Sequence, residues 1–100
     1  MWHKVAKISD IADEKSQMVE IESQIIALFN VRGQFYAMQN ACPHRGGPLV
    51  EGHMEGNIVT CPWHAWQFDI KNGECQTIKG SAQKTYPVKV EGEEIYIEVL

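Results

Sequence analysis

The sequence lacks any apolar run near the ~20 residues that a helix needs to span a bilayer. The segment from Met1 to Lys7 also lacks the apolar stretch of a secretory signal. Basic charge is not in excess, since the formal net charge is -4, and this disfavours a nucleic acid partner. We therefore expect a cytoplasmic protein with no membrane role, and the acidic balance weakly favours a basic protein partner.

Cysteine is scarce, and three residues cannot all pair in disulfides. In a reducing compartment, cysteines close to histidines more often bind metal than form disulfides. The sequence also contains no Ser-His-Asp set, no phosphate-binding glycine loop and no iron site of two histidines and a carboxylate. We therefore expect a protein that is not an enzyme.

The residue pattern favours short β-strands in one domain that spans residues 1–100. Apolar and polar residues alternate along 88–91 and 95–99, and turn residues fall at 32–33, 55–57, 71–73 and 91–92. Residues 9–14 allow no more than one helical turn. The expected fold is an all-β antiparallel sandwich or barrel. The predicted strands are 3–7, 18–21, 25–30, 34–39, 57–60, 67–69, 85–91 and 94–99.

Two segments depart from the strand pattern, and each carries one cysteine and one histidine. The first loop, residues 41–49, contains Cys42 and His44, and the second loop, residues 61–66, contains Cys61 and His64. Thiolate and imidazole are ligands that iron-sulfur clusters and late transition metals select. Two such pairs supply the four protein ligands of a closed site.

Proline and glycine shape both loops. Pro43 and Pro62 fix φ inside each Cys/His pair, whereas Gly46 and Gly47 permit positive φ. We expect the two glycines to turn backbone N–H groups toward sulfur. A structural Cys2His2 zinc site is the main alternative, although such sites more often group Cys with Cys and His with His.

The spacing Cys-x-His, sixteen residues, Cys-x-x-His resembles the ligand pattern of Rieske 2Fe-2S proteins. Pro43, Pro62, Trp63 and Phe68-Asp69 match its usual surroundings, and the close match spans about 41–73. The resemblance implies a Rieske-type fold with a cluster-binding subdomain formed by the two loops. It also implies that the cysteines bind a deep iron and the histidines an iron near the surface, with the ligands Cys42, His44, Cys61 and His64.

The high-potential members of the family carry two further cysteines that cross-link the loops, and this chain has Gly47 and Trp63 there. Where those members place hydroxyl donors to sulfur, it has Trp66 and Phe68. Fewer hydrogen-bond donors stabilise the reduced state less, so we expect a reduction potential of about -150 mV, at the low end of the Rieske range. This agrees with the soluble ferredoxins of ring-hydroxylating dioxygenase systems, which the second loop resembles.

One position departs from the family. Ala65 stands where glycine is usual, and a positive φ there would cost about 1 kcal/mol or more.

The resemblance implies an electron carrier between a flavin-containing NAD(P)H reductase and a terminal oxygenase. A small subunit of an assimilatory nitrite reductase and a zinc-stabilised interaction module are the alternatives, and the oligomeric state stays open. The expected partner face is formed by residues near the histidines: His44, Arg45, Gly46, Pro48, Leu49 and His64.

The remaining candidates have simpler interpretations. His3 and His53 lack a ligand partner in their motifs and are expected to be solvated, and Cys75 is expected in the core. Trp63 and Trp66 are expected to shield the cluster or to contact a partner, with shielding favoured for Trp66.

Overall fold

The computed structural model describes residues 1–42, 46–63 and 65–99. This part of the chain consists of antiparallel strands, 3-10 turns and loops, and it contains no α-helix. The predicted all-β antiparallel class is confirmed. The elements are β1 (Trp2–Lys7), η1 (Ile8–Asp10), β2 (Lys15–Ile21), β3 (Gln24–Val31), β4 (Gln34–Gln39), η2 (Leu49–Glu51), β5 (His53–Glu55), β6 (Ile58–Thr60), β7 (Gln67–Asp69), β8 (Thr85–Tyr86), β9 (Val88–Glu91) and β10 (Glu94–Glu98).

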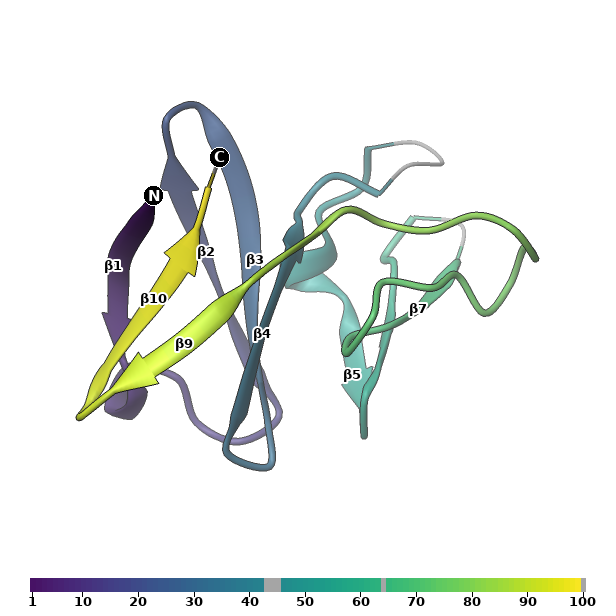
Figure 1. Cartoon of the computed structure of the whole chain (residues 1–100). Helices are drawn as coiled ribbons and strands as arrows, with labels where there is room; N and C mark the ends of the chain where they lie inside the picture. The colour runs from purple at the N-terminus through teal and green to yellow at the C-terminus, as the bar shows by residue number, and fades with distance from the viewer. Residues whose placement is uncertain (43–45, 64, 100) are drawn as a thin grey trace.

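The strands form three sheets that follow one another as layers (Figure 1). The outer sheet has the order β1-β10-β9, the central sheet β2-β3-β4-β8, and the loop-side sheet β5-β6-β7. In Figure 1, β3 and β4 lie between the outer sheet and the part of the chain that contains β5 and β7.

Strand β3 is covered on both faces, and every residue from Ile26 to Val31 is buried. Ile26 and Leu28 face the outer sheet, whereas Ala27 and Phe29 face the loop side. A strand that is covered on both faces needs apolar side chains at successive positions. This explains why the sequence shows a continuous apolar run here instead of alternation.

The two faces of the central sheet belong to separate cores. The outer core comprises Ala6, Ile11, Ile21, Ile26, Leu28, Ala37, Tyr86, Ile95, Ile97 and Val99. The loop-side core comprises Ala27, Phe29, Val31, Met38, Cys42, Leu49, Val59, Cys61, Phe68, Ile70 and Cys75.

Most predicted strands match observed ones, and those at 34–39 and 67–69 have the predicted bounds. The strand predicted at 85–91 is divided at Pro87, because β8 pairs with β4 in the central sheet and β9 pairs with β10 in the outer sheet. Strand β5 and the turn η2 were not predicted. The helical turn expected within 9–14 is the 3-10 turn η1, one residue earlier.

Candidate metal centre

The first loop leaves strand β4 and the second loop connects β6 to β7, so both begin at the loop-side core. Cys42 and Cys61 are each 2% exposed and belong to this core. The Cys42 thiol is close enough to Cys61 to affect its pKa, and Cys42, Cys61 and Cys75 are all free cysteines. The fold thus brings together two buried thiols that lie far apart in the sequence.

Burial raises the pKa of the Cys61 thiol above its ordinary value, and the neighbouring Cys42 thiol raises this pKa further. The backbone N–H of Trp63 opposes both effects by donating to Cys61 Sγ at 3.4 Å. A buried thiol that holds its proton becomes a thiolate when a metal cation takes the place of that proton. The environment of Cys61 is suited to a metal-bound sulfur rather than to a free thiolate.

Backbone hydrogen bonds close both loops around their cysteines. In the first loop, the Cys42 N–H donates to the Gly47 carbonyl at 2.9 Å, and the Gly46 N–H donates to the Cys42 carbonyl at 2.7 Å. In the second loop, the Cys61 N–H donates to the Trp66 carbonyl at 2.7 Å. These bonds fix the backbone at each cysteine independently of any metal.

The two loop glycines serve different purposes. Gly46 has φ +76°, as expected, but its N–H donates to a carbonyl and not to sulfur. Gly47 does not have a positive φ, so that part of the prediction is wrong. Position 47 has no room for a larger residue, because a Cβ there would lie 2.8 Å from Cys61 Sγ and 3.0 Å from Trp63 Cγ. The first loop therefore packs directly on the second at this point.

Ala65 has φ +60°, in the left-handed region that favours glycine. The sequence predicted backbone strain here if this residue adopted a positive φ, and it does. The second loop thus contains an unfavourable residue, at a cost of about 1 kcal/mol or more.

Several predicted site residues, namely Pro43, His44, Arg45 and His64, lie outside the described residues. Among the residues that are described, no group of three His, Cys, Asp or Glu side chains could hold a metal ion. Of the four expected ligands, the described residues include the two cysteines, Cys42 and Cys61. Their buried thiols, the N–H that donates to sulfur and the space kept clear by Gly47 fit a sulfur-ligated metal centre.

The expected partner face needs one correction. Leu49 is fully buried in the loop-side core, because the 3-10 turn that follows Pro48 directs its side chain inward. Gly46 is exposed and Pro48 is half-buried. Trp63 is 50% exposed, whereas Trp66 is half-buried and packs against the loop-side core. The two tryptophans therefore occupy different environments, and the packing of Trp66 agrees with the shielding that was favoured for it.

Two buried amides beside the first loop were not predicted. Asn40 accepts the Val50 N–H at its side-chain oxygen at 2.9 Å, and its own carbonyl accepts the Leu49 N–H at 2.8 Å. Gln83 donates from its side chain to the carbonyls of Gln39 and Ala41. The position of Asn40 next to the first loop could have drawn attention to it, but Gln83 stands in a polar stretch that carries no such signal.

The other candidate residues are away from the paired thiols. Cys75 is buried in the loop-side core, as expected, and His53 is exposed. His3 was expected to be solvated, but it is half-buried with its Nε2 3.2 Å from Glu22 Oε2. The reason is that the β1 strand places His3 beside the turn that follows β2.

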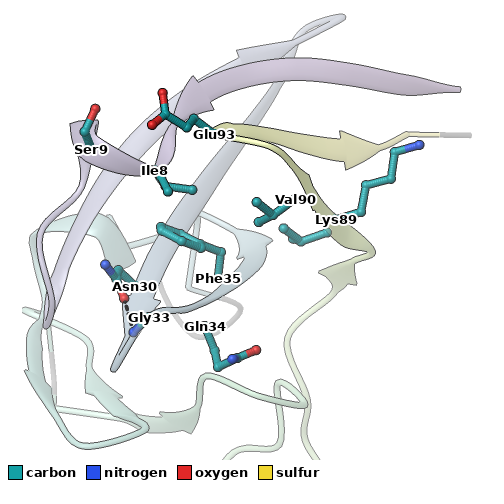
Figure 2. A pocket seen from close by; sticks show the side chains of 10 residues that line it. Ile8, Ser9, Asn30, Gly33, Gln34, Phe35, Lys89, Val90 and Glu93 are labelled. Carbon is teal, nitrogen blue, oxygen red and sulfur yellow. Dashed lines mark hydrogen bonds between the residues drawn. The ribbon is translucent and has the colours of Figure 1, made fainter.

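A pocket of about 650 Å³ opens between the outer and central sheets (Figure 2). Phe35, Ile8 and Val90 line it, and its lining residues include no cysteine or histidine. This pocket is separate from the paired thiols. The described part of the chain also holds no helix with the length and hydropathy to cross a membrane.

Comparisons with known proteins agree with this geometry. The model of the Rieske [2Fe-2S] domain matches residues 1–94. The ferredoxin component of the naphthalene 1,2-dioxygenase system of Pseudomonas putida is 33% identical over 100 residues, covering 98% of this chain and 95% of that protein.

Solved structures show the same fold. The ferredoxin of Sphingomonas yanoikuyae B1 has a TM-score of 0.91 and 27% identity, with 100% of both chains covered. A chain in the complex of reduced oxygenase and oxidized ferredoxin in carbazole 1,9a-dioxygenase has a TM-score of 0.89 and 28% identity, covering 96% of this chain and 91% of that one. The protein thus belongs to the Rieske [2Fe-2S] domain family, whose cofactor is a Rieske-type 2Fe-2S cluster.

Proposed function

We propose that the cluster is held by one Cys/His pair from each loop: Cys42 with His44, and Cys61 with His64. The observation that carries this proposal is that two free thiols from separate loops are both buried in the same core, near enough for one to raise the pKa of the other. The two histidines are assigned from the ligand spacing in the sequence. When bound, a Rieske cluster accepts and releases one electron at a time.

The protein acts as an electron carrier and not as an enzyme. It takes electrons from a flavin-containing NAD(P)H reductase and passes them to a terminal, aromatic ring-hydroxylating oxygenase. The name of the naphthalene dioxygenase ferredoxin and the carbazole dioxygenase complex support the oxygenase side of this chain of transfer. The reductase side depends on the resemblance in sequence.

The rest of the chain positions and protects the cluster within a single Rieske domain, residues 1–100, whose cluster-binding portion is about 41–73. The buried cysteines keep the inner side of the site away from water, and half-buried Trp66 adds to that cover. Half-exposed Trp63 next to His64 offers an apolar contact for a protein partner. Free cysteines suit a reducing compartment, and we propose the cytoplasm.

The test of this function starts with the purified protein. We expect a red-brown protein with two irons and two acid-labile sulfides per chain. A colourless protein that contains one zinc would show that the site is structural.

A redox titration then tests the kind of carrier. We expect a midpoint potential of about -150 mV, because neither Trp66 nor Phe68 supplies a hydroxyl donor to the cluster. A clearly positive midpoint would contradict an oxygenase ferredoxin, since such a carrier would hold its electron too tightly. Neighbouring genes for an oxygenase and a reductase would support the assignment, whereas a neighbouring sirohaem enzyme would favour nitrite reductase.

A further inference from the structure

Gln83 is a buried polar residue, 6% exposed, next to the start of the first loop. Its side-chain Nε2 donates to the carbonyl of Gln39 at 2.7 Å and to the carbonyl of Ala41 at 2.6 Å. Gln39 is the last residue of β4, and Ala41 directly precedes Cys42. One side chain thus holds the backbone on both sides of the point where the chain leaves the central sheet.

The chemistry of these contacts fixes the orientation of the amide. Both partners are carbonyl oxygens, which only accept hydrogen bonds, so the donor NH2 group must face them. The amide oxygen in turn accepts the backbone N–H of Lys84 at 3.3 Å. An apolar side chain of the same length could make none of these bonds.

The backbone of Gln83 connects to the other loop. Its N–H donates to the Gly73 carbonyl at 2.7 Å, and the Gly73 N–H donates to the carbonyl of Asp69 at 2.7 Å. Asp69 ends β7, the strand that follows the second loop. A Cβ at Gly73 would lie 2.4 Å from the Gln83 carbonyl oxygen, so the approach of these two segments needs glycine.

We propose that Gln83 is a positioning residue that fixes the first loop relative to the second and so sets the relation between Cys42 and Cys61. Its side chain holds the segment that leads into Cys42, and its backbone is tied to the hairpin that carries Cys61. In Figure 1 the green segment that returns from the loop side toward β9 is the part of the chain that contains this residue. The role in retaining the cluster depends on the proposed function.

The test compares Gln83→Met with Gln76→Met, made in the protein as purified. Methionine keeps the length of glutamine and removes both donors. Gln76 is exposed and its side chain makes a single 3.2 Å bond to the Glu74 carbonyl, so it is a matched control in the same segment.

Three measurements are informative. In Gln83→Met we expect the amides of Cys42 and Gly46 to exchange with deuterium about tenfold faster, because the carbonyls of Gln39 and Ala41 lose their side-chain donor. The outer sheet should keep its exchange rates. We also expect cluster loss to a chelator to be about tenfold faster and the EPR signal of the reduced protein to change, with Gln76→Met matching the parent within about twofold.

Unchanged exchange at Cys42 and Gly46, or equal acceleration in the outer sheet, would overturn the proposal. An EPR signal identical to that of the parent would also overturn it, because a displaced ligand loop must change the cluster environment. Should Gln83→Met not fold, Gln83→Asn keeps the amide but is one methylene too short to reach both carbonyls, and the same outcomes apply. The exchange data stand without any cluster, so a protein without iron would disprove the proposed function and leave the positioning role testable.

Discussion

The two cores on either side of the central sheet are built by different means. The outer core is formed largely by aliphatic side chains of regular strands, such as Ile26, Ile95 and Ile97. The loop-side core contains all three cysteines, and part of it comes from loops rather than strands. Apolar packing alone can place strands, but a metal site needs backbone positions fixed one by one.

On the loop side, three features fix such positions near the cysteines. Gly47 allows the two loops to touch, Ala65 adopts a positive φ, and Gln83 bridges backbone segments with a buried amide. Such features add little stability or even reduce it. We therefore expect substitutions on the loop side to affect the cluster more than the fold, and the following predictions test this difference.

The largest effect is expected for Cys61→Ser. This protein should contain no 2Fe-2S cluster, because a ligand is lost, while the outer sheet stays folded. Iron and sulfide content, visible absorbance and hydrogen exchange measure the two parts separately. Cys75→Ser, which changes another buried cysteine of the same core, should keep the parent spectrum. A spectrum lost in Cys75→Ser would show that the cysteine ligands are misassigned.

Gly47→Ala should have the next largest effect. The new Cβ must displace Cys61 Sγ or the Trp63 ring, and overpacking of this kind costs about 1–3 kcal/mol. Cluster loss on heating should therefore be faster, with a shifted visible spectrum. Gly56→Ala is the control, because Gly56 has φ +61° and open space around it. It should cost about 1 kcal/mol of stability and leave the spectrum unchanged. Equal spectra for all three proteins would refute the steric argument.

Ala65→Gly should stabilise the protein. Glycine relieves the strain of φ +60°, and after its own entropic cost the gain should be about 0.5–1 kcal/mol. Denaturant unfolding and the rate of cluster loss would detect it. The control Ala82→Gly changes an exposed alanine without a positive φ and should be neutral or slightly destabilising. A lower stability for Ala65→Gly would mean that the alanine methyl makes a compensating contact.

The smallest effect is expected for Tyr86→Phe in the central sheet, which should change how the stability of the protein depends on pH. Burial raises the pKa of Tyr86, whose hydroxyl donates to Gln24 Oε1 at 2.8 Å. Above about pH 10 the unfolded chain releases this proton while the folded chain retains it, so stability is complete below that pH and falls as pH rises. Comparing unfolding at pH 8 and pH 11, Tyr86→Phe should lose less stability than the parent. An equal loss in both proteins would assign the pH dependence to other groups.

The sequence predicted the parts of the fold that depend on side-chain pattern. Alternation along 88–91 and 95–99 predicted strands that are observed as β9 and β10, and the strands predicted at 34–39 and 67–69 have the observed bounds. The apolar run of β3 follows from burial on both faces. The pattern failed where the chain changes direction inside an apparently uniform stretch. Pro87 divides one predicted strand between two sheets, and the turn η2 buries Leu49, which was expected on the partner face.

The candidate site was predictable to the extent that chemistry marks its residues. The spacing of Cys42 and Cys61 within their motifs suggested one site, and the structure buries both thiols in the same core. Residue type does not reveal how close the neighbouring atoms are to a glycine. Gly47 was therefore expected to adopt a positive φ, whereas the structure shows that it allows a close approach of the second loop. Gln83 acts through two carbonyls more than 40 positions earlier in the chain, and only the tertiary structure brings them to it.

The order of strands in the sheets also has a consequence for the folding pathway. Strands β2, β3 and β4 pair with their immediate neighbours in the chain, so their contacts are local, whereas β1 pairs with β10 and Met1 meets Val99, 98 positions away. Local contacts form at a lower entropic cost than distant ones. We expect the central meander to form early as a template, with the loop-side segment docking on one face and the closing pair of terminal strands on the other. A nascent chain would then present its two thiols on an already ordered surface, ready for cluster delivery before the outer sheet is complete.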